Sequence, residues 1–365
     1  MTALDRVTAQ GDAPKQRMSG PVQPPHHRTR LAAALDWLVH AQDVTGSGAF
    51  APDYPIDGSC GDGLRGGQRA CPDTTGPVIP TLYLAAWYLE RPELAQRAER
   101  AAQWAVETQL SSGAVWGGVV GTGRALLGWL SAFAETGSGV FAGASRRAGR
   151  FLVATLDQDG MWRRDGARAP YTAWALAEAG RRLGAPEFRA AAARHLRAVT
   201  RVPHDHGWMR DYGRGVPERS SPLCDIADAI RGLLEGGRLF GEERLSAHAA
   251  LAAAGVAAAM APDGRLPGRF AAGWRPQGSP CCLVAQARMV NIWLRLFEIT
   301  GATQWLEPVR PALGFLTSAQ HRDGAIAGPA RICSTATKLF VDALIRDERI
   351  ARGLAREATA AVVLA

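Results

Sequence analysis

Apolar residues recur along most of this chain with the spacing of one face of an α-helix. Near the C-terminal third, for example, Val290, Trp293, Leu294 and Phe297 follow the i, i+3, i+4 pattern of an amphipathic helix. The same spacing predicts twelve helices and almost no β-strand. The expected fold class is therefore all-α.

The twelve predicted helices alternate between two sets. The first set covers residues 30–42, 94–110, 145–157, 187–200, 242–260 and 303–320. The second set covers residues 75–91, 121–135, 171–183, 225–240, 282–300 and 334–350. Links from a second-set helix to the next first-set helix are short, whereas several links in the other direction are long, above all residues 43–74, 201–224 and 261–281. Long loops at one end only are typical of a scaffold with one functional rim.

A glycine follows each first-set helix, after one or more polar residues and before an apolar or aromatic one. These six glycines are Gly48, Gly113, Gly160, Gly207, Gly264 and Gly324, at intervals of 47 to 65 residues. Glycine adopts a positive φ without a Cβ clash, so it closes the C-terminus of a helix well. Six copies at such intervals indicate a repeat architecture. We therefore expect six helical hairpins closed into one (α/α)6 toroid over residues 30–350.

The two ends of the chain are expected to lie outside the toroid. Residues 1–29 are rich in proline and polar side chains and are predicted to form a disordered leader, and residues 351–365 a C-terminal helical tail. Asp5 lies near the start and no apolar segment of a secretory signal follows it. The longest apolar run, residues 247–261, is too short to span a bilayer. We expect a cytoplasmic protein without a membrane span.

Composition narrows the class of partner. The formal charge is +8, but the arginines are scattered along the chain and no nucleic-acid motif occurs. We therefore expect no nucleic-acid partner and a small-molecule or oligosaccharide substrate that is anionic; the sequence does not predict the oligomeric state. Cys224, Cys282 and Cys333 each stand at the start of a second-set helix, but no Cys-x-x-Cys or Cys–His pair accompanies them. We expect reduced thiols, no bound metal and no cofactor.

The densest group of reactive side chains lies in the fourth rim loop and the helix after it. We predict that the catalytic acid and base are among His204, His206, Tyr212, Asp225 and Asp228. Imidazole and carboxylate groups exchange protons near neutral pH, and the i, i+3 spacing of the two aspartates places them on one helix face. The alternative is a solvated polar loop followed by aspartates that only cap the helix.

A second group of rim residues is predicted to bind the substrate. It comprises Arg65, Arg69, Asp73, Trp162, Arg163, Trp208, Arg210, Trp274, Gln286, Arg288 and Lys338. The cations would lie above helix N-termini, whose unpaired N–H groups also favour anions. Tryptophans in the turns have an alternative role, which is to pack one hairpin against the next.

Four segments of the chain resemble a known superfamily. They are residues 35–43 (LDWLVHAQD), 72–81 (PDTTGPVIPT), 292–301 (IWLRLFEITG) and 338–344 (KLFVDAL). With the six glycine turns, they are similar to the α/α toroid of terpenoid cyclases and protein prenyltransferase β-subunits. They resemble more closely a bacterial branch of this superfamily, whose genes lie beside genes for polysaccharides and secondary metabolites. The Asp-x-Asp-Asp acid of class II terpenoid cyclases is absent from this sequence.

Three functions follow from these observations. The leading one is an enzyme that performs acid–base chemistry, as a lyase, hydrolase or cyclase, on a polar anionic substrate such as a uronic-acid glycan or a biosynthetic intermediate. The resemblance implies the first alternative, an isoprenoid cyclase that acts through a carbocation. The second alternative is a toroid that binds a glycan or peptide without catalysis.

Overall fold

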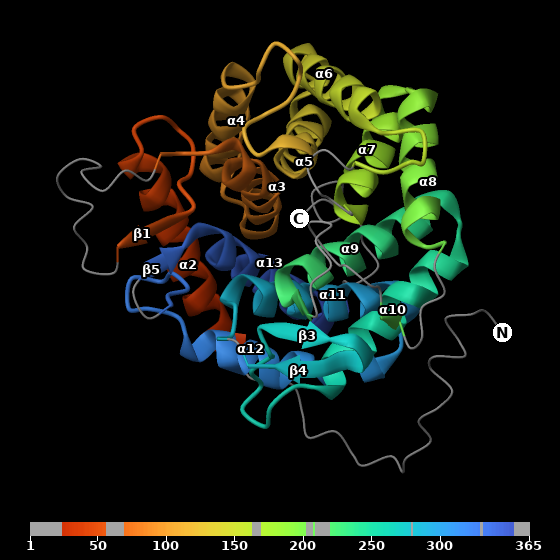
Figure 1. Ribbon diagram of the computed structural model, residues 1–365. Helices are drawn as coiled ribbons and strands as arrows, with labels where there is room; N and C mark the ends of the chain where they lie inside the picture. The colour runs from red at the N-terminus through yellow and green to blue at the C-terminus, as the bar shows by residue number, and fades with distance from the viewer. Residues whose placement is uncertain are drawn as a thin grey trace.

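The computed structural model describes the central part of the chain with gaps in several loops. The described residues are 24–55, 69–162, 169–201, 207–208, 220–278, 280–328 and 331–353. Within them, twelve α-helices form an inner and an outer ring (Figure 1). None of these described helices is both long enough and apolar enough to cross a membrane.

The inner ring consists of the second helices of the six hairpins. These are α3 (Pro72–Leu89), α5 (Gly118–Thr136), α7 (Pro170–Leu183), α9 (Leu223–Phe240), α11 (Leu283–Thr300) and α13 (Ser334–Ala351). The outer helices are α2 (Pro24–Val44), α4 (Pro92–Glu107), α6 (Gly139–Thr155), α8 (Pro186–Val199), α10 (Glu243–Ala258) and α12 (Val309–Ser318). Each inner helix contacts the next one, and α13 contacts α3. The ring is closed, and the predicted all-α toroid of six hairpins is confirmed.

Most helix ends lie within a few residues of the predicted ones, and the exceptions have local causes. Helix α2 begins at Pro24, so the last residues of the predicted leader are helical. The predicted helix 303–320 is divided into η5 (Thr303–Leu306) and α12. Pro308 lies at the division, and proline lacks the backbone N–H that a continuous helix needs. Helix α6 begins early because Ser138 caps it, accepting a hydrogen bond from the N–H of Val140.

Short strand pairs order the rim between the helices. Strands β1 (Asp53–Pro55) and β5 (Arg331–Cys333) pair antiparallel, and so do β2 (Ser220–Pro222), β3 (Arg269–Ala271) and β4 (Arg275–Gln277) in a second sheet. Each strand has three residues, so the described chain has very little strand, as expected. Strand β2 leads directly into α9 and β5 into α13, which fixes where these two inner helices start.

The six turn glycines perform the role that the repeat predicts. All six have a positive φ, between 74° and 101°. Each lies against the outer helix of the following hairpin: a Cβ on Gly264 would meet the carbonyl oxygen of Pro311 at 2.0 Å, and one on Gly324 would meet that of Ala33 in α2 at 2.0 Å. The last turn therefore packs against the first outer helix and closes the ring.

Side-chain amides bind the same turns to the neighbouring hairpin. Gln42 Nε2 donates to the carbonyl oxygens of Gly48 at 2.6 Å and Arg97 at 2.9 Å. Gln320 Nε2 donates to those of Gly324 at 2.8 Å and Arg30 at 3.0 Å. The glutamine before the glycine is thus a structural part of the repeat.

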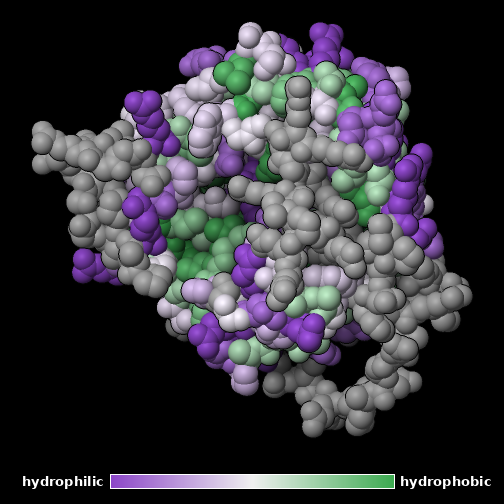
Figure 2. Space-filling model, in the orientation of Figure 1, coloured by the Kyte–Doolittle hydropathy of each residue, from purple (hydrophilic) through white to green (hydrophobic). Residues whose placement is uncertain are grey.

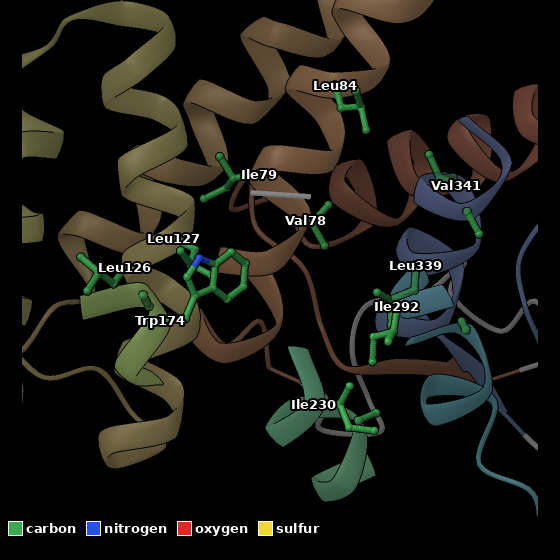
Figure 3. Close-up of a cluster of buried hydrophobic side chains, with 14 of the residues drawn as sticks. Val78, Ile79, Leu84, Leu126, Leu127, Trp174, Ile230, Ile292, Leu339 and Val341 are labelled. Carbon is green, nitrogen blue, oxygen red and sulfur yellow. The ribbon is translucent and has the colours of Figure 1, made fainter. Parts of the chain in front are cut away.

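The interior of the ring combines an apolar cluster with buried ion pairs. Figure 3 shows apolar side chains from all six inner helices meeting in one cluster, among them Val78, Leu127, Trp174, Ile230, Ile292 and Leu339. Glu235 of α9 accepts from Arg295 of α11 at 2.8 Å, and Glu298 of α11 accepts from Arg346 of α13 at 2.8 Å. Burial opposes the charge of Glu235, but Arg295 and Arg231 outweigh it and lower its pKa to about 2.

Candidate functional site

A cavity lies at the N-terminal ends of the inner helices. All of its lining residues belong to the first ten residues of these helices: Pro77, Arg124, Tyr171, Trp174, Ala227, Asp228, Arg231, Arg288, Asn291, Ile292, Thr335, Lys338 and Leu339. The empty space is about 510 Å³, including open solvent at the mouth. Figure 2 shows the molecular surface hollowed near the centre of the ring, with hydrophobic and hydrophilic residues both exposed there. Converging helix N-termini favour negative charge at such a place.

Asp228 is the carboxylate in the cavity wall, and two guanidinium groups hold it. Its Oδ2 lies 2.9 Å from Nη2 of Arg124, and its Oδ1 lies 3.0 Å from Nη1 of Arg288. Both carboxylate oxygens are therefore fixed, one from α5 and one from α11. A carboxylate held in one orientation is a suitable general base.

Arg124 connects this carboxylate to a second one. Its Nη1 lies 3.3 Å from Oδ2 of Asp73, at the start of α3. Burial disfavours the charged form of Arg124, but the charges of Asp228 and Asp73 outweigh burial and raise the pKa of the guanidinium. Arg124 therefore stays charged and joins α3, α5 and α9 across the cavity.

Tyr171 supplies a protonated hydroxyl beside Asp228. Burial, and then the negative charge of Asp228, raise the pKa of its phenol to about 12. The ring packs edge-on against Trp174, with 5.1 Å between the ring centroids. At neutral pH the phenol is a hydrogen-bond or proton donor, next to a carboxylate that can accept a proton.

Two further cations line the cavity, each with a partner carboxylate on its own helix. The guanidinium of Arg231 lies 5.3 Å from the ring centroid of Trp174 and 3.3 Å from Glu235. Burial lowers the pKa of Arg231 to about 10 in spite of Glu235, so it is still charged at neutral pH. Lys338 Nζ donates to Asp342 at 2.7 Å; burial lowers the pKa of this amine, and Asp342 opposes the shift.

Asn291 offers a fixed hydrogen-bond acceptor. Its Nδ2 donates to the carbonyl oxygens of Ala287 at 2.9 Å and Leu339 at 2.8 Å, which determines the orientation of the amide. Its Oδ1 is buried and has no hydrogen-bond partner among the described residues. Because a buried acceptor is costly to leave unsatisfied, this oxygen is suited to a ligand hydroxyl.

Four of the predicted site residues come together here. Asp228, Arg288 and Lys338 line the cavity, and Asp73 reaches it through Arg124. Asp225 lies in the first turn of α9 but not in the cavity wall. Arg69 is exposed at the start of the described segment 69–162 and is not part of the lining. The predictions for His204, His206, Tyr212, Arg65, Arg163 and Arg210 lie outside the described residues.

The remaining predicted binding residues occupy structural positions. Gln286 is fully buried: its Oε1 accepts from the N–H of Leu266 at 2.9 Å, and its Nε2 donates to the carbonyl of Gly264 at 2.7 Å. Trp162 is buried, and its Nε1 donates to the carbonyl of Leu152 at 2.9 Å. Both hold turns rather than line the cavity.

Trp208 and Trp274 form an aromatic pair elsewhere on the rim. Their ring centroids are 5.2 Å apart at an interplanar angle of 85°, and Phe270 lies 5.8 Å from Trp274. Gly255 of α10 leaves room for the indole, because a Cβ there would lie 2.5 Å from it. Neither tryptophan lines the described cavity.

The sequence reasoning missed Arg124, Tyr171, Trp174, Arg231, Asn291 and Thr335, which also line the cavity. A signal for most of them was present. Four inner helices each present a pair of lining residues three positions apart in their first ten residues: Tyr171 and Trp174, Asp228 and Arg231, Arg288 and Asn291, Thr335 and Lys338. Residues three apart share a helix face, so polar pairs that interrupt an apolar stripe point to a cavity.

Comparisons with known proteins agree with this architecture. A structure of an unsaturated glucuronyl hydrolase specific for heparin is 17% identical, with a TM-score of 0.71, and the match covers 91% of this chain and 99% of that one. A D-mannose isomerase is 13% identical, with a TM-score of 0.69 and coverage of 91% and 100%. Cellobiose 2-epimerase from Bacillus thermoamylovorans is 11% identical, with a TM-score of 0.66 and coverage of 89% and 98%. The chain has their fold.

The comparisons establish the fold of the chain but not its family. No protein-family model matches the chain, and no curated protein matches it either. The similar structures thus show the α/α toroid fold, and their names are those of enzymes that act on sugars. In the described part of the chain, no three His, Cys, Asp or Glu side chains gather closely enough to hold a metal ion.

Proposed function

We propose that the protein is an enzyme that performs acid–base chemistry on an anionic carbohydrate, with a uronic-acid glycan as the preferred substrate class. The observation that carries the proposal is Asp228, held between Arg124 and Arg288 in the cavity wall with the protonated phenol of Tyr171 nearby. A fixed base and a proton donor on one wall are what both glycoside cleavage and sugar isomerisation require. The names of the similar structures, a glucuronyl hydrolase, an isomerase and an epimerase, support the same class.

The charges of the lining residues favour an anionic substrate. Four cationic side chains and one carboxylate line the cavity, and the partner carboxylates of Arg231 and Lys338 lie farther along their helices. Within the described residues, Nη1 of Arg288 contacts Asp228 and the carbonyl of Cys224, and no hydrogen bond from its Nε or Nη2 occurs, so these two groups can bind a substrate carboxylate. A guanidinium fork matches a carboxylate in a bidentate way.

The neutral groups of the wall suit sugar hydroxyls. Asn291 Oδ1 accepts a hydroxyl hydrogen, and the two aromatic rings of Tyr171 and Trp174 offer apolar surface to a sugar ring. In the proposed reaction, Asp228 takes a proton from water or from a carbon-bound or oxygen-bound position of the substrate, while Tyr171 donates one to the departing or carbonyl oxygen. Only two aromatic rings, Tyr171 and Trp174, line the described cavity, too few to surround a carbocation with aromatic faces, which argues against the isoprenoid alternative.

The test is a paired panel of uronides and their neutral counterparts. Saturated and unsaturated uronide oligosaccharides, and glycosides that differ only by replacing the carboxylate with a hydroxymethyl group, are incubated with the protein; products are identified by mass spectrometry and binding is measured by calorimetry. We expect turnover of at least one uronide and binding of its neutral counterpart to be weaker by at least about tenfold, the effect of losing one ionic contact of about 1.4 kcal/mol.

The panel also separates the competing functions. Uronide binding without turnover would favour a non-catalytic glycan-binding toroid. Equal affinity for both members of each pair, or no binding to any uronide, would refute the anionic substrate class.

A further inference from the structure

Two cysteine thiols from different inner helices lie in contact beside the cavity wall. The Sγ atoms of Cys224 and Cys282 are 3.0 Å apart, although 58 residues separate the two in the chain. Cys224 is the second residue of α9, and Cys282 is the N-cap of α11. The two sulfurs are within about 1 Å of the S–S bond length of about 2.05 Å, so a small movement brings them to bonding distance.

The two thiols have different environments. The hydrogen bond between the two thiols lowers the pKa of Cys282. Burial opposes this shift, whereas the N–H groups of Ala285 and Val284 and the charge of Arg288 add to it. The same hydrogen bond, together with burial, raises the pKa of Cys224. A thiolate at a helix N-terminus is an attacking nucleophile, and a neighbouring protonated thiol is the group that completes a disulfide. Both side chains are partly exposed and thus open to a small oxidant.

We propose that Cys224 and Cys282 form a redox-active dithiol site, which a low-molecular-weight disulfide oxidises to an intramolecular disulfide between α9 and α11. This proposal does not depend on the proposed reaction of the cavity. The Cys282 thiolate attacks one sulfur of the oxidant, forming a mixed disulfide and releasing one thiolate. Cys224 then loses its proton, attacks Sγ of Cys282 and releases the second thiolate. The protein loses two electrons and two protons, and the small disulfide becomes two thiols.

The other three described cysteines do not combine a sulfur–sulfur contact with a lowered pKa. Cys281 donates to Gln286 Oε1 at 3.6 Å, and burial raises its pKa to about 11. Cys71 donates to Thr74 Oγ1 at 3.2 Å, and burial raises its pKa as well. Burial also raises the pKa of Cys333. A protonated thiol reacts slowly with disulfides, and among the described cysteines only Cys224 and Cys282 have their sulfur atoms in contact, so the described structure singles out this pair.

The site is coupled to the cavity through the backbone. Arg288 Nη1 donates to the carbonyl oxygen of Cys224 at 3.4 Å as well as contacting Asp228. A disulfide here therefore joins the first turns of the two helices that carry Asp228 and Arg288. Closing the chain between residues 58 apart also restricts the unfolded state, so we expect the oxidised protein to melt at a higher temperature.

The experiment is a redox titration of the full chain with mixtures of reduced and oxidised glutathione. Free thiols are then blocked with a maleimide, and disulfides are located by peptide mapping. We expect two thiols to be lost together, the intact mass to fall by two hydrogen atoms, a Cys224–Cys282 peptide pair to appear, and the melting temperature to rise. Reduction should reverse all four changes.

Single serine variants provide the matched controls. Cys281→Ser changes the residue next to the site and should leave the disulfide and its midpoint potential unchanged. In Cys282→Ser, neither the glutathione adduct nor the disulfide should form. In Cys224→Ser, the reaction should end at a glutathione adduct on Cys282. The proposal is overturned if the wild-type protein keeps both thiols free, if it retains only glutathione adducts, or if the disulfide maps to another pair. Intact wild-type protein supplies the decisive result even if a variant fails to fold.

Discussion

Asp228 of α9 and Arg124 of α5 form an ion pair, Oδ2 to Nη2 at 2.9 Å, between two inner helices that have α7 between them in the ring. The two residues are 104 positions apart in the chain. Their contact therefore passes over the start of α7, where Tyr171 lies. This arrangement holds the carboxylate, the guanidinium groups and the phenol in one place.

The first prediction concerns Asp228. Asp228→Asn keeps the size of the side chain but removes the base, so turnover of the uronide found in the panel should fall by roughly 10²–10⁴-fold. Asp225→Asn is the matched control, since Asp225 lies one turn earlier on the same helix and not in the cavity wall. Its turnover should stay close to wild type in the same steady-state assay. Equal losses in both variants would mean that helix capping, and not proton transfer, is responsible.

A second prediction separates binding from chemistry at Arg288. Arg288→Lys keeps the charge but loses the fork that matches a carboxylate, so KM for the uronide should rise more than kcat falls. The neutral counterpart of the substrate should show little change in affinity between wild type and variant. A loss of the same size for both compounds would show that Arg288 only holds Asp228 in place.

A third prediction addresses the proton donor. Tyr171→Phe removes only the phenol oxygen, so kcat should fall while the melting temperature stays nearly unchanged. In the wild-type protein, the alkaline decline in rate that is due to the phenol should lie above 10, the ordinary pKa of tyrosine, toward the raised pKa of about 12, and should be absent in Tyr171→Phe. A decline near pH 10 from Arg231 should be common to both proteins. A kcat in Tyr171→Phe equal to wild type would exclude the phenol as the acid.

The buried pair of Glu235 and Arg295 predicts how stability depends on pH. The pKa of Glu235 is about 2 in the folded protein, against an ordinary value of 4.5 for a glutamate, so folding depresses it. Its stabilising contribution is complete above the unfolded pKa and is lost as the pH falls toward the folded one. We expect the free energy of unfolding to decline below a pH of about 4.5.

The variant Glu235→Gln tests this assignment. It removes the carboxylate that Arg295 shares with Arg231 and should lower the melting temperature at neutral pH, where a broken buried pair costs about 3–5 kcal/mol. The difference from wild type should shrink as the pH falls from about 4.5 toward 2, because the unfolded wild-type chain then binds a proton at Glu235 that the folded protein does not yet bind. A pH-independent difference would count against Glu235 as the titrating group.

The last prediction compares two glycines with similar backbone angles and different surroundings. Gly264 has φ of 83° and Gly301 has φ of 69°, but only at Gly264 would a Cβ strike a neighbour, the carbonyl of Pro311 at 2.0 Å. Gly301→Ala should cost about 1–2 kcal/mol, the strain of a left-handed residue. Gly264→Ala should cost clearly more in chemical denaturation. Equal costs would show that the turn does not pack tightly on the next hairpin.

The sequence by itself determined the fold of this protein, because the fold rests on local properties. Apolar spacing defined the helices, and the six turn glycines all adopt the positive φ that their position predicts. The sequence also predicted four residues of the site, because charged side chains near the start of second-set helices lie under the rim by connectivity alone. These residues are Asp73, Asp228, Arg288 and Lys338.

The tertiary structure alone decided which faces of the inner helices meet the cavity. Gln286 and Arg288 are two residues apart on α11, so about 200° of helix rotation separates their side chains. One holds the turn at Gly264 and the other binds Asp228. The periodic pattern does not distinguish the two, because both are polar residues near the start of a helix. Only the packing of α9 and α13 against α11 directs one outward and the other into the ring, because residues far apart in the chain determine which helices lie on either side of α11.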